Sequence, residues 1–84
     1  MEFEDKITKV KTRGDLAEFV SGLRADLDNH PERWENDSLP NFLEAMATWI
    51  EDMDQYYRNR GEEFSENQPW ALFGTILLAA RGYE

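Results

Sequence analysis

Residues 70–81 read WALFGTILLAAR and form the most apolar stretch of the chain. At about 100° of rotation per helical residue, only Gly74, Thr75 and Arg81 interrupt its apolar surface. A helix that is apolar nearly all the way round must be enclosed, either by the rest of its own domain or by a partner. The stretch therefore predicts a helix over residues 69–81 and points to an interface, but it indicates no particular chemistry.

Two amphipathic segments precede this stretch. The first covers residues 12–29, where apolar side chains recur every three or four positions, as in a helix with one inward face. Thr12 is its expected N-cap and Asp15 completes a capping-box pattern. Pro31 ends the segment because a proline disfavours helical geometry in the preceding residue, His30.

The second amphipathic segment covers residues 39–60. Ser38 is the expected N-cap, Pro40 lies in the first turn, and Gly61 is a typical residue just after a helix end. Its apolar face is broad and contains Phe42, Leu43, Met46, Trp49, Ile50, Met53 and Tyr57. We expect Trp49 at the centre of the core, surrounded by Leu23, Phe42, Met53 and Ile76.

Three helices with short connections and no strand pattern predict an all-α fold. The expected architecture is a small antiparallel three-helix bundle, with an irregular, partly extended segment over residues 1–11. No repeat, linker or low-complexity tract divides the 84 residues, so we expect a single domain over residues 1–84.

The charge of the chain is strongly negative, with a formal net value of −9. From Gly14 onward there are 15 acidic residues and only five arginines. Such a surface repels nucleic acid and anionic membranes, and it attracts cationic partners. The same charge also keeps a small protein soluble, so both interpretations stay open.

The carboxylates do not form a recognisable catalytic or metal-binding pattern. Glu44 and Glu51 fall on the outer face of the helix over residues 39–60, with Asp52 on its shoulder, whereas a di-metal bundle directs its carboxylates inward. His30 is the only histidine and there is no cysteine. The Asp-x-Asp pairs at residues 26–28 and 52–54 lack the glycine of a calcium loop. We therefore expect no enzymatic activity, no cofactor and no metal; an enzyme that uses Glu44, Glu51 or Asp52 is a third alternative.

The expected location is the cytoplasm. Residues 1–5 are acidic and lack the cationic start of a signal peptide. The apolar run at residues 70–81 is shorter than the roughly 20 residues that span a bilayer.

Two further features are candidates for partner binding. Trp34 lies in a polar connection, where a large aromatic side chain either fills the core or anchors a partner. On the last helix, Ala71, Gly74 and Leu78 belong to a stripe of small or apolar residues that faces away from the other helices. Self-association would cover this stripe, or the N-terminal segment with Ile7 and Val10 would fold over it.

Several short motifs resemble a family of short bacterial proteins known as a domain of unknown function. They are Trp34-Glu35-Asn36, Phe42-Leu43-Glu44-Ala45 followed by Trp49, Tyr56-Tyr57, Pro69-Trp70 and Leu77-Leu78-Ala79-Ala80. The resemblance covers residues 10–84. It implies a compact domain and brings no activity, cofactor or site residue with it.

The sequence thus favours an acidic protein-interaction domain, such as an inhibitor or immunity-like partner of a basic protein. Its expected partner-binding residues are Glu44, Glu51, Asp52, Trp34, Ala71, Gly74 and Leu78. The alternative is a structural or homo-oligomeric helical domain, joined through the helix at residues 69–81, whose acidity only maintains solubility.

Overall fold

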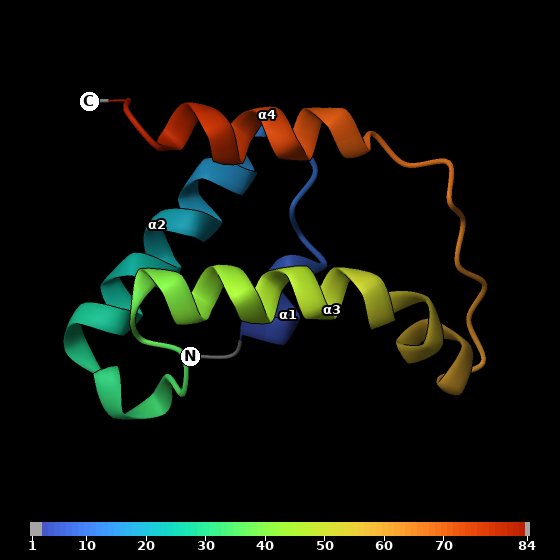
Figure 1. Ribbon diagram of the computed structural model, residues 1–84, viewed down its shortest axis with the longest axis horizontal. Helices are drawn as coiled ribbons and strands as arrows, with labels where there is room; N and C mark the ends of the chain where they lie inside the picture. Colours follow the sequence, from blue (N-terminus) through green and yellow to red (C-terminus); the bar gives the residue numbers. More distant parts are fainter. Residues whose placement is uncertain (1–2, 84) are drawn as a thin grey trace. The chain divides into compact units, whose positions relative to one another are not determined.

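The computed structural model describes residues 3–83 (Figure 1). Its elements are α1 (Phe3–Ile7), α2 (Arg13–Asn29), the 3₁₀ turn η1 (Pro31–Arg33), α3 (Leu39–Asn59) and α4 (Trp70–Ala80). No strand occurs among these residues, which confirms the all-α class. The chain divides into two compact units: an N-terminal unit that extends to Thr48 and a C-terminal unit that begins at Trp49 within α3.

In the N-terminal unit, α2 begins with a capping box. The Asp15 N–H donates to Thr12 Oγ1 at 3.0 Å, and Asp15 Oδ2 accepts from the Thr12 N–H at 3.2 Å. The same carboxylate also accepts from the Lys11 N–H at 3.0 Å. Three backbone groups that would lack a partner at the helix start are therefore satisfied, and the predicted N-cap is correct.

The expectation of an extended lead-in over residues 1–11 is wrong at Phe3–Ile7, which forms α1. Glu4 and Asp5 lie in its first turn and Lys6 lies in its last, so the charges complement the helix dipole. A helix of five residues is marginal by itself. An edge-to-face contact between Phe3 and Phe19, with ring centroids 5.7 Å apart, attaches it to α2. The first two positions of the expected lead-in, residues 1–2, lie outside the described residues.

The start of α3 follows the prediction from Ser38. The Asn41 N–H donates to Ser38 Oγ at 3.3 Å, and the Phe42 N–H donates to the Ser38 carbonyl at 2.9 Å. Ser38 therefore supplies both its side chain and its carbonyl to the first turn.

The end of α3 lies in the C-terminal unit and is a Schellman motif. The Glu62 N–H donates to the Tyr57 carbonyl at 2.9 Å, and the Gly61 N–H donates to the Arg58 carbonyl at 3.0 Å. Gly61 has φ +74°, a left-handed conformation that glycine adopts without steric cost. The predicted helix stop is therefore correct and has a specific geometry.

The last helix, α4, starts after Pro69, which is its N-cap residue. No charged residue occurs between Trp70 and Ala80. Thr75, the most polar side chain of this helix, donates its hydroxyl to the Ala71 carbonyl at 2.8 Å. The helix surface is therefore apolar throughout, as the sequence predicts.

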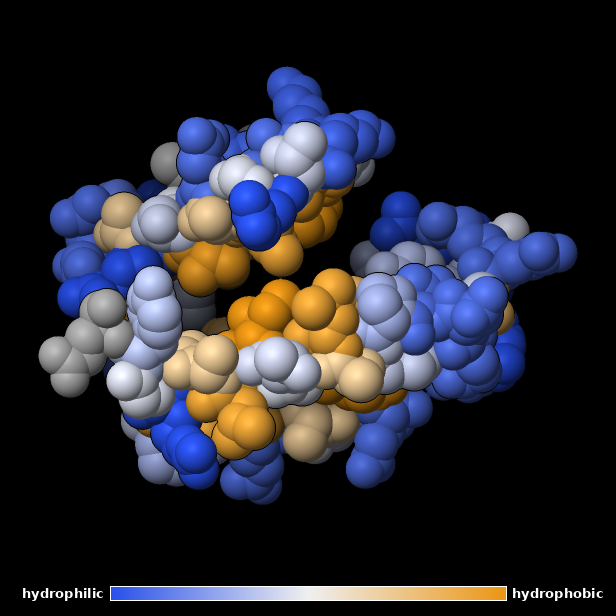
Figure 2. Space-filling view, turned by 90° about the horizontal axis from the view of Figure 1, so that it is seen from above, coloured by the Kyte–Doolittle hydropathy of each residue, from blue (hydrophilic) through white to orange (hydrophobic). Residues whose placement is uncertain are grey.

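None of the described residues is fully buried, and apolar side chains lie at the surface of the molecule (Figure 2). Trp49 is 47 % exposed, and its ring lies 5.8 Å from that of Tyr56, two turns further along α3. The expectation that Trp49 occupies the centre of a core with Leu23 and Phe42, which belong to the N-terminal unit, stays a prediction. The antiparallel bundle expected from the sequence remains a prediction.

Candidate functional site

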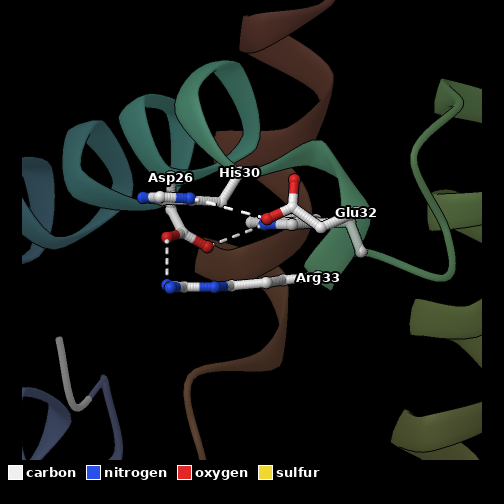
Figure 3. A network of polar contacts seen from close by, with 5 residues as sticks. Asp26, His30, Glu32 and Arg33 are labelled. Atoms are coloured by element: carbon white, nitrogen blue, oxygen red, sulfur yellow. Dashed lines mark hydrogen bonds and ion pairs between the residues drawn. The ribbon is translucent and has the colours of Figure 1, made fainter.

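A polar network links the C-terminal end of α2 with η1 (Figure 3). The Asp26 carboxylate accepts a hydrogen bond from Trp34 Nε1 at 2.9 Å and lies 3.5 Å from a terminal nitrogen of Arg33. The Asp26 side chain is only 10 % exposed, so these contacts replace most of the water that would otherwise hydrate its carboxylate. Nearby, His30 Nδ1 lies 3.6 Å from the carboxylate of Glu32.

This network determines the position of Trp34, one of the predicted partner-binding residues. Besides donating to Asp26, the half-buried indole contacts Phe42, with ring centroids 6.2 Å apart. The Trp34 side chain is thus bound within its own unit. Its polar edge is satisfied by Asp26, so any role in partner binding would use the remaining ring face.

The C-terminal unit contains a continuous row of aromatic side chains. It runs from Trp49 through Tyr56, Tyr57, Phe64 and Trp70 to Phe73, and successive ring centroids are between 5.1 and 6.2 Å apart. Tyr57 and Phe64 are nearly parallel, with an interplanar angle of 14°. This row connects the end of α3, the following connection and the start of α4 into one cluster.

A recess of about 310 Å³ opens beside this aromatic row. It is lined by the apolar residues Ile50, Phe64 and Trp70 and by the acidic residues Glu51, Asp54 and Glu66. The six residues come from α3, the connection and the first residue of α4. The lining therefore combines aromatic and acidic residues, a pairing that favours cationic groups.

Only one of these three carboxylates has a basic partner in the described part of the chain. Asp54 Oδ2 lies 3.0 Å from a terminal nitrogen of Arg58. Glu51 and Glu66 form no ion pair among residues 3–83. The backbone of Glu66 is fixed, because its carbonyl accepts a hydrogen bond from Trp70 Nε1 at 2.8 Å. The recess therefore keeps an excess of negative charge.

Arg60 shows how the same unit binds a guanidinium group. Its guanidinium carbon lies 5.3 Å from the ring centroid of Tyr56, one terminal nitrogen donates to the Tyr56 hydroxyl at 2.7 Å, and Nε lies 3.1 Å from Glu62. The hydrogen bond with Tyr56, followed by the negative charge of Glu62, raises the pKa of Arg60 above its usual range. One aromatic ring and one carboxylate thus suffice to position an arginine here.

The structure places the predicted acidic residues on α3. Glu44 is exposed in the N-terminal unit, whereas Glu51 and Asp52 are exposed in the C-terminal unit, where Glu51 lines the recess. None of the three forms an ion pair within the described residues. Their carboxylates are therefore available to solvent or to a partner.

The predicted residues of the last helix also lie at the surface. Ala71, Gly74 and Leu78 are exposed on α4, and Leu78 is 60 % exposed. A methyl group added at Gly74 would meet no atom within 4 Å apart from its chain neighbours and the backbone of its own helix. The helix thus presents small and apolar groups without any charge.

Sequence reasoning missed Asp54, Phe64 and Glu66 as parts of a recess. One spacing could have indicated part of it: Glu51 and Asp54 are three residues apart on α3 and so share a helix face. The position of Phe64 in an irregular connection has no such periodic signal.

Two further properties of the described residues bear on metal binding and on membrane insertion. Among residues 3–83, no group of three or more histidine, cysteine, aspartate or glutamate side chains is arranged to bind a metal ion. Within the same range, every helix is too short or too polar to span a bilayer.

The described fold defines a small all-α protein. Residues 12–84 match a family of unknown function, DUF7660, and because the match covers most of the sequence, the chain belongs to this family. The match confirms the resemblance to a domain-of-unknown-function family. Neither the curated proteins nor the solved structures include one that matches this chain.

Proposed function

We propose that the chain is a protein-interaction module that binds a basic protein, as an inhibitor or immunity-like partner would. The observation that carries the proposal is the combination of unpaired carboxylates and exposed apolar side chains in the C-terminal unit. Glu51, Asp52 and Glu66 have no basic partner among the described residues, and large side chains such as Trp49 and Ile50 are exposed beside them. Aromatic anchors surrounded by polar groups are typical of interfaces that bind proteins.

The charge supports a cationic partner over an anionic one. The described part of the C-terminal unit has six carboxylates and three arginines, and two of these arginines, Arg58 and Arg60, are already paired with Asp54 and Glu62. Opposite charge accelerates association and selects the partner, and salt weakens this contribution. Nucleic acid is disfavoured because acidic residues outnumber basic ones around the aromatic rings of residues 49–83.

The test is affinity capture from a cell extract of the source organism, followed by titration of the purified captured protein. We expect a basic partner whose affinity falls when the salt concentration rises. The double variant Glu51→Gln with Asp52→Asn should bind more weakly than the control variant Glu18→Gln with Glu35→Gln, which removes the same charge elsewhere. An affinity that is independent of salt, or equal losses in both variants, contradicts the proposal.

A second candidate function is self-association through α4. The observation that favours it is the absence of charge from Trp70 to Ala80, together with the exposure of Leu72, Phe73 and Leu78. Exposed apolar patches on soluble proteins mark interfaces more often than they mark free surface. Sedimentation velocity of the purified chain over a range of concentrations tests this candidate directly.

A further inference from the structure

We infer that the recess formed by Ile50, Glu51, Asp54, Phe64, Glu66 and Trp70 accepts the side chain of an arginine from the basic partner. This inference rests on the proposed function, because it names the group through which that partner is recognised. The lining contains both kinds of residue that recognise arginine: the aromatic residues Phe64 and Trp70, and acidic residues whose carboxylates can accept from guanidinium N–H groups.

The size of the recess suits a single side chain. Its volume of about 310 Å³ lies at the lower end of the range for small-molecule pockets, which begins at about 300 Å³. The rings of Phe64 and Trp70 are tilted by 37° with centroids 6.2 Å apart, so they do not form a parallel stack.

The net negative charge of the recess favours the binding of one further cation. Arg58 already offsets the charge of Asp54, whereas Glu51 and Glu66 have no basic partner within residues 3–83. The indole of Trp70 cannot satisfy the Glu66 carboxylate, because it donates to the Glu66 backbone carbonyl. A guanidinium offers five N–H donors in a fixed plane, whereas an ammonium offers three at the end of a flexible stem, so arginine suits a recess lined by more than one acidic residue.

The C-terminal unit already contains one arginine that is bound by an aromatic ring and a carboxylate. Arg60 lies over the ring of Tyr56 while its Nε contacts Glu62, so an aromatic ring and a carboxylate bind one guanidinium within the same unit. The recess is lined by two aromatic residues and three acidic residues. Among the described residues, no arginine pairs with Glu51 or Glu66. The recess therefore has the chemistry of an arginine site with no intramolecular occupant among the described residues.

The experiment titrates the full chain with a blocked Gly-Gly-Arg-Gly-Gly peptide and follows the indole N–H signals in ¹⁵N-correlated spectra. The Trp70 signal is assigned with a Trp70→Phe variant. We expect the arginine peptide to shift the Trp70 signal progressively while leaving the Trp34 signal in place. The matched lysine peptide should bind several-fold more weakly, and a citrulline peptide, which is isosteric but uncharged, should not shift the Trp70 signal.

A charge-matched pair of variants then separates the recess from the general acidity. Glu51→Gln with Glu66→Gln should weaken binding of the arginine peptide about tenfold, whereas Glu18→Gln with Glu63→Gln should leave it within about twofold. All four positions are exposed, so circular dichroism should show unchanged helicity in both variants. Equal weakening in the two variants, or equal binding of the citrulline peptide, overturns the arginine site.

The two proposals fail in different ways. If the arginine peptide does not shift the Trp70 signal but a basic protein binds in a salt-dependent way and the Glu51→Gln with Asp52→Asn variant weakens that binding, the arginine site is wrong and the proposed function stands. If neither the arginine peptide nor any basic protein binds, both proposals are wrong.

Discussion

Trp34 Nε1 donates a hydrogen bond of 2.9 Å to Oδ2 of Asp26, across the boundary between α2 and η1. This bond is the shortest polar contact of a carboxylate that is only 10 % exposed, since Arg33 lies further away at 3.5 Å. The indole therefore replaces much of the water that the Asp26 carboxylate loses.

The variant Trp34→Phe tests this relationship, because it keeps an aromatic ring beside Phe42 and removes the donor. We expect the free energy of unfolding to fall by about 1–3 kcal/mol, the usual cost of leaving a largely buried polar group without its partner. Urea denaturation followed by circular dichroism measures the change. The control is Trp49→Phe, since Trp49 is half exposed; equal losses in the two variants would show that ring size, and not the bond to Asp26, is responsible.

The capping box predicts a pH dependence at the start of α2. The backbone N–H of Lys11, with further hydrogen bonds from Thr12, holds the pKa of the Asp15 carboxyl below its usual value of 3.8. A lowered pKa in the folded state means that the stabilisation is present above the pKa of the unfolded chain. It is lost as the pH falls through the lower value of the folded state.

We therefore expect the unmodified chain to lose α2 stability in the acid range below about pH 4, in addition to the general effect of its other carboxylates. The variant Asp15→Asn keeps the acid destabilisation caused by the other carboxylates, but it has no carboxyl group at position 15 to titrate. Comparison of the two chains by thermal denaturation at several pH values therefore isolates the contribution of Asp15. A difference between them that does not shrink on acidification would contradict the capping role of the carboxylate.

The left-handed Gly61 and the helical Gly74 predict opposite effects of the same substitution. Gly61→Ala places a Cβ at φ +74° and should destabilise the chain by about 1 kcal/mol. Gly74→Ala adds a methyl group in open space inside α4 and should stabilise that helix by about 0.5–1 kcal/mol. Thermal unfolding of both variants gives the two signs; a stabilising Gly61→Ala would mean that the Schellman motif does not form.

The ends of the helices could be read from the sequence because they depend on local chemistry. Thr12 with Asp15, Ser38, and Gly61 each act on backbone groups a few residues away, and the structure has α2, α3 and α4 within one residue of the expected bounds. The short helix α1 escapes such reasoning because five residues carry too little periodicity to distinguish a helix from a strand.

The packing of side chains could not be read in the same way. The periodicity of α3 shows which residues share a face, but it does not show that Trp49 packs along its own helix against Tyr56. The sequence indicates that Glu51 and Asp54 share a face of α3, but it does not indicate the recess, because the recess depends on where the irregular connection places Phe64 and Glu66. The bond between Trp34 and Asp26 likewise depends on the conformation of η1, which no pattern in the sequence indicates.

The last prediction concerns the apolar surface of α4. Leu78 is 60 % exposed on a helix without charged residues, and Ala71 and Gly74 on the same helix are small enough to let a second helix approach closely. If α4 is a self-association surface, Leu78→Glu should convert a dimer to a monomer in sedimentation velocity while leaving the helical circular dichroism unchanged. The control is Ala17→Glu, which adds the same charge at an exposed position of α2. A chain that remains monomeric at high concentration, and that loses its helicity on Leu78→Glu, would show that the α4 surface is instead covered within the same molecule.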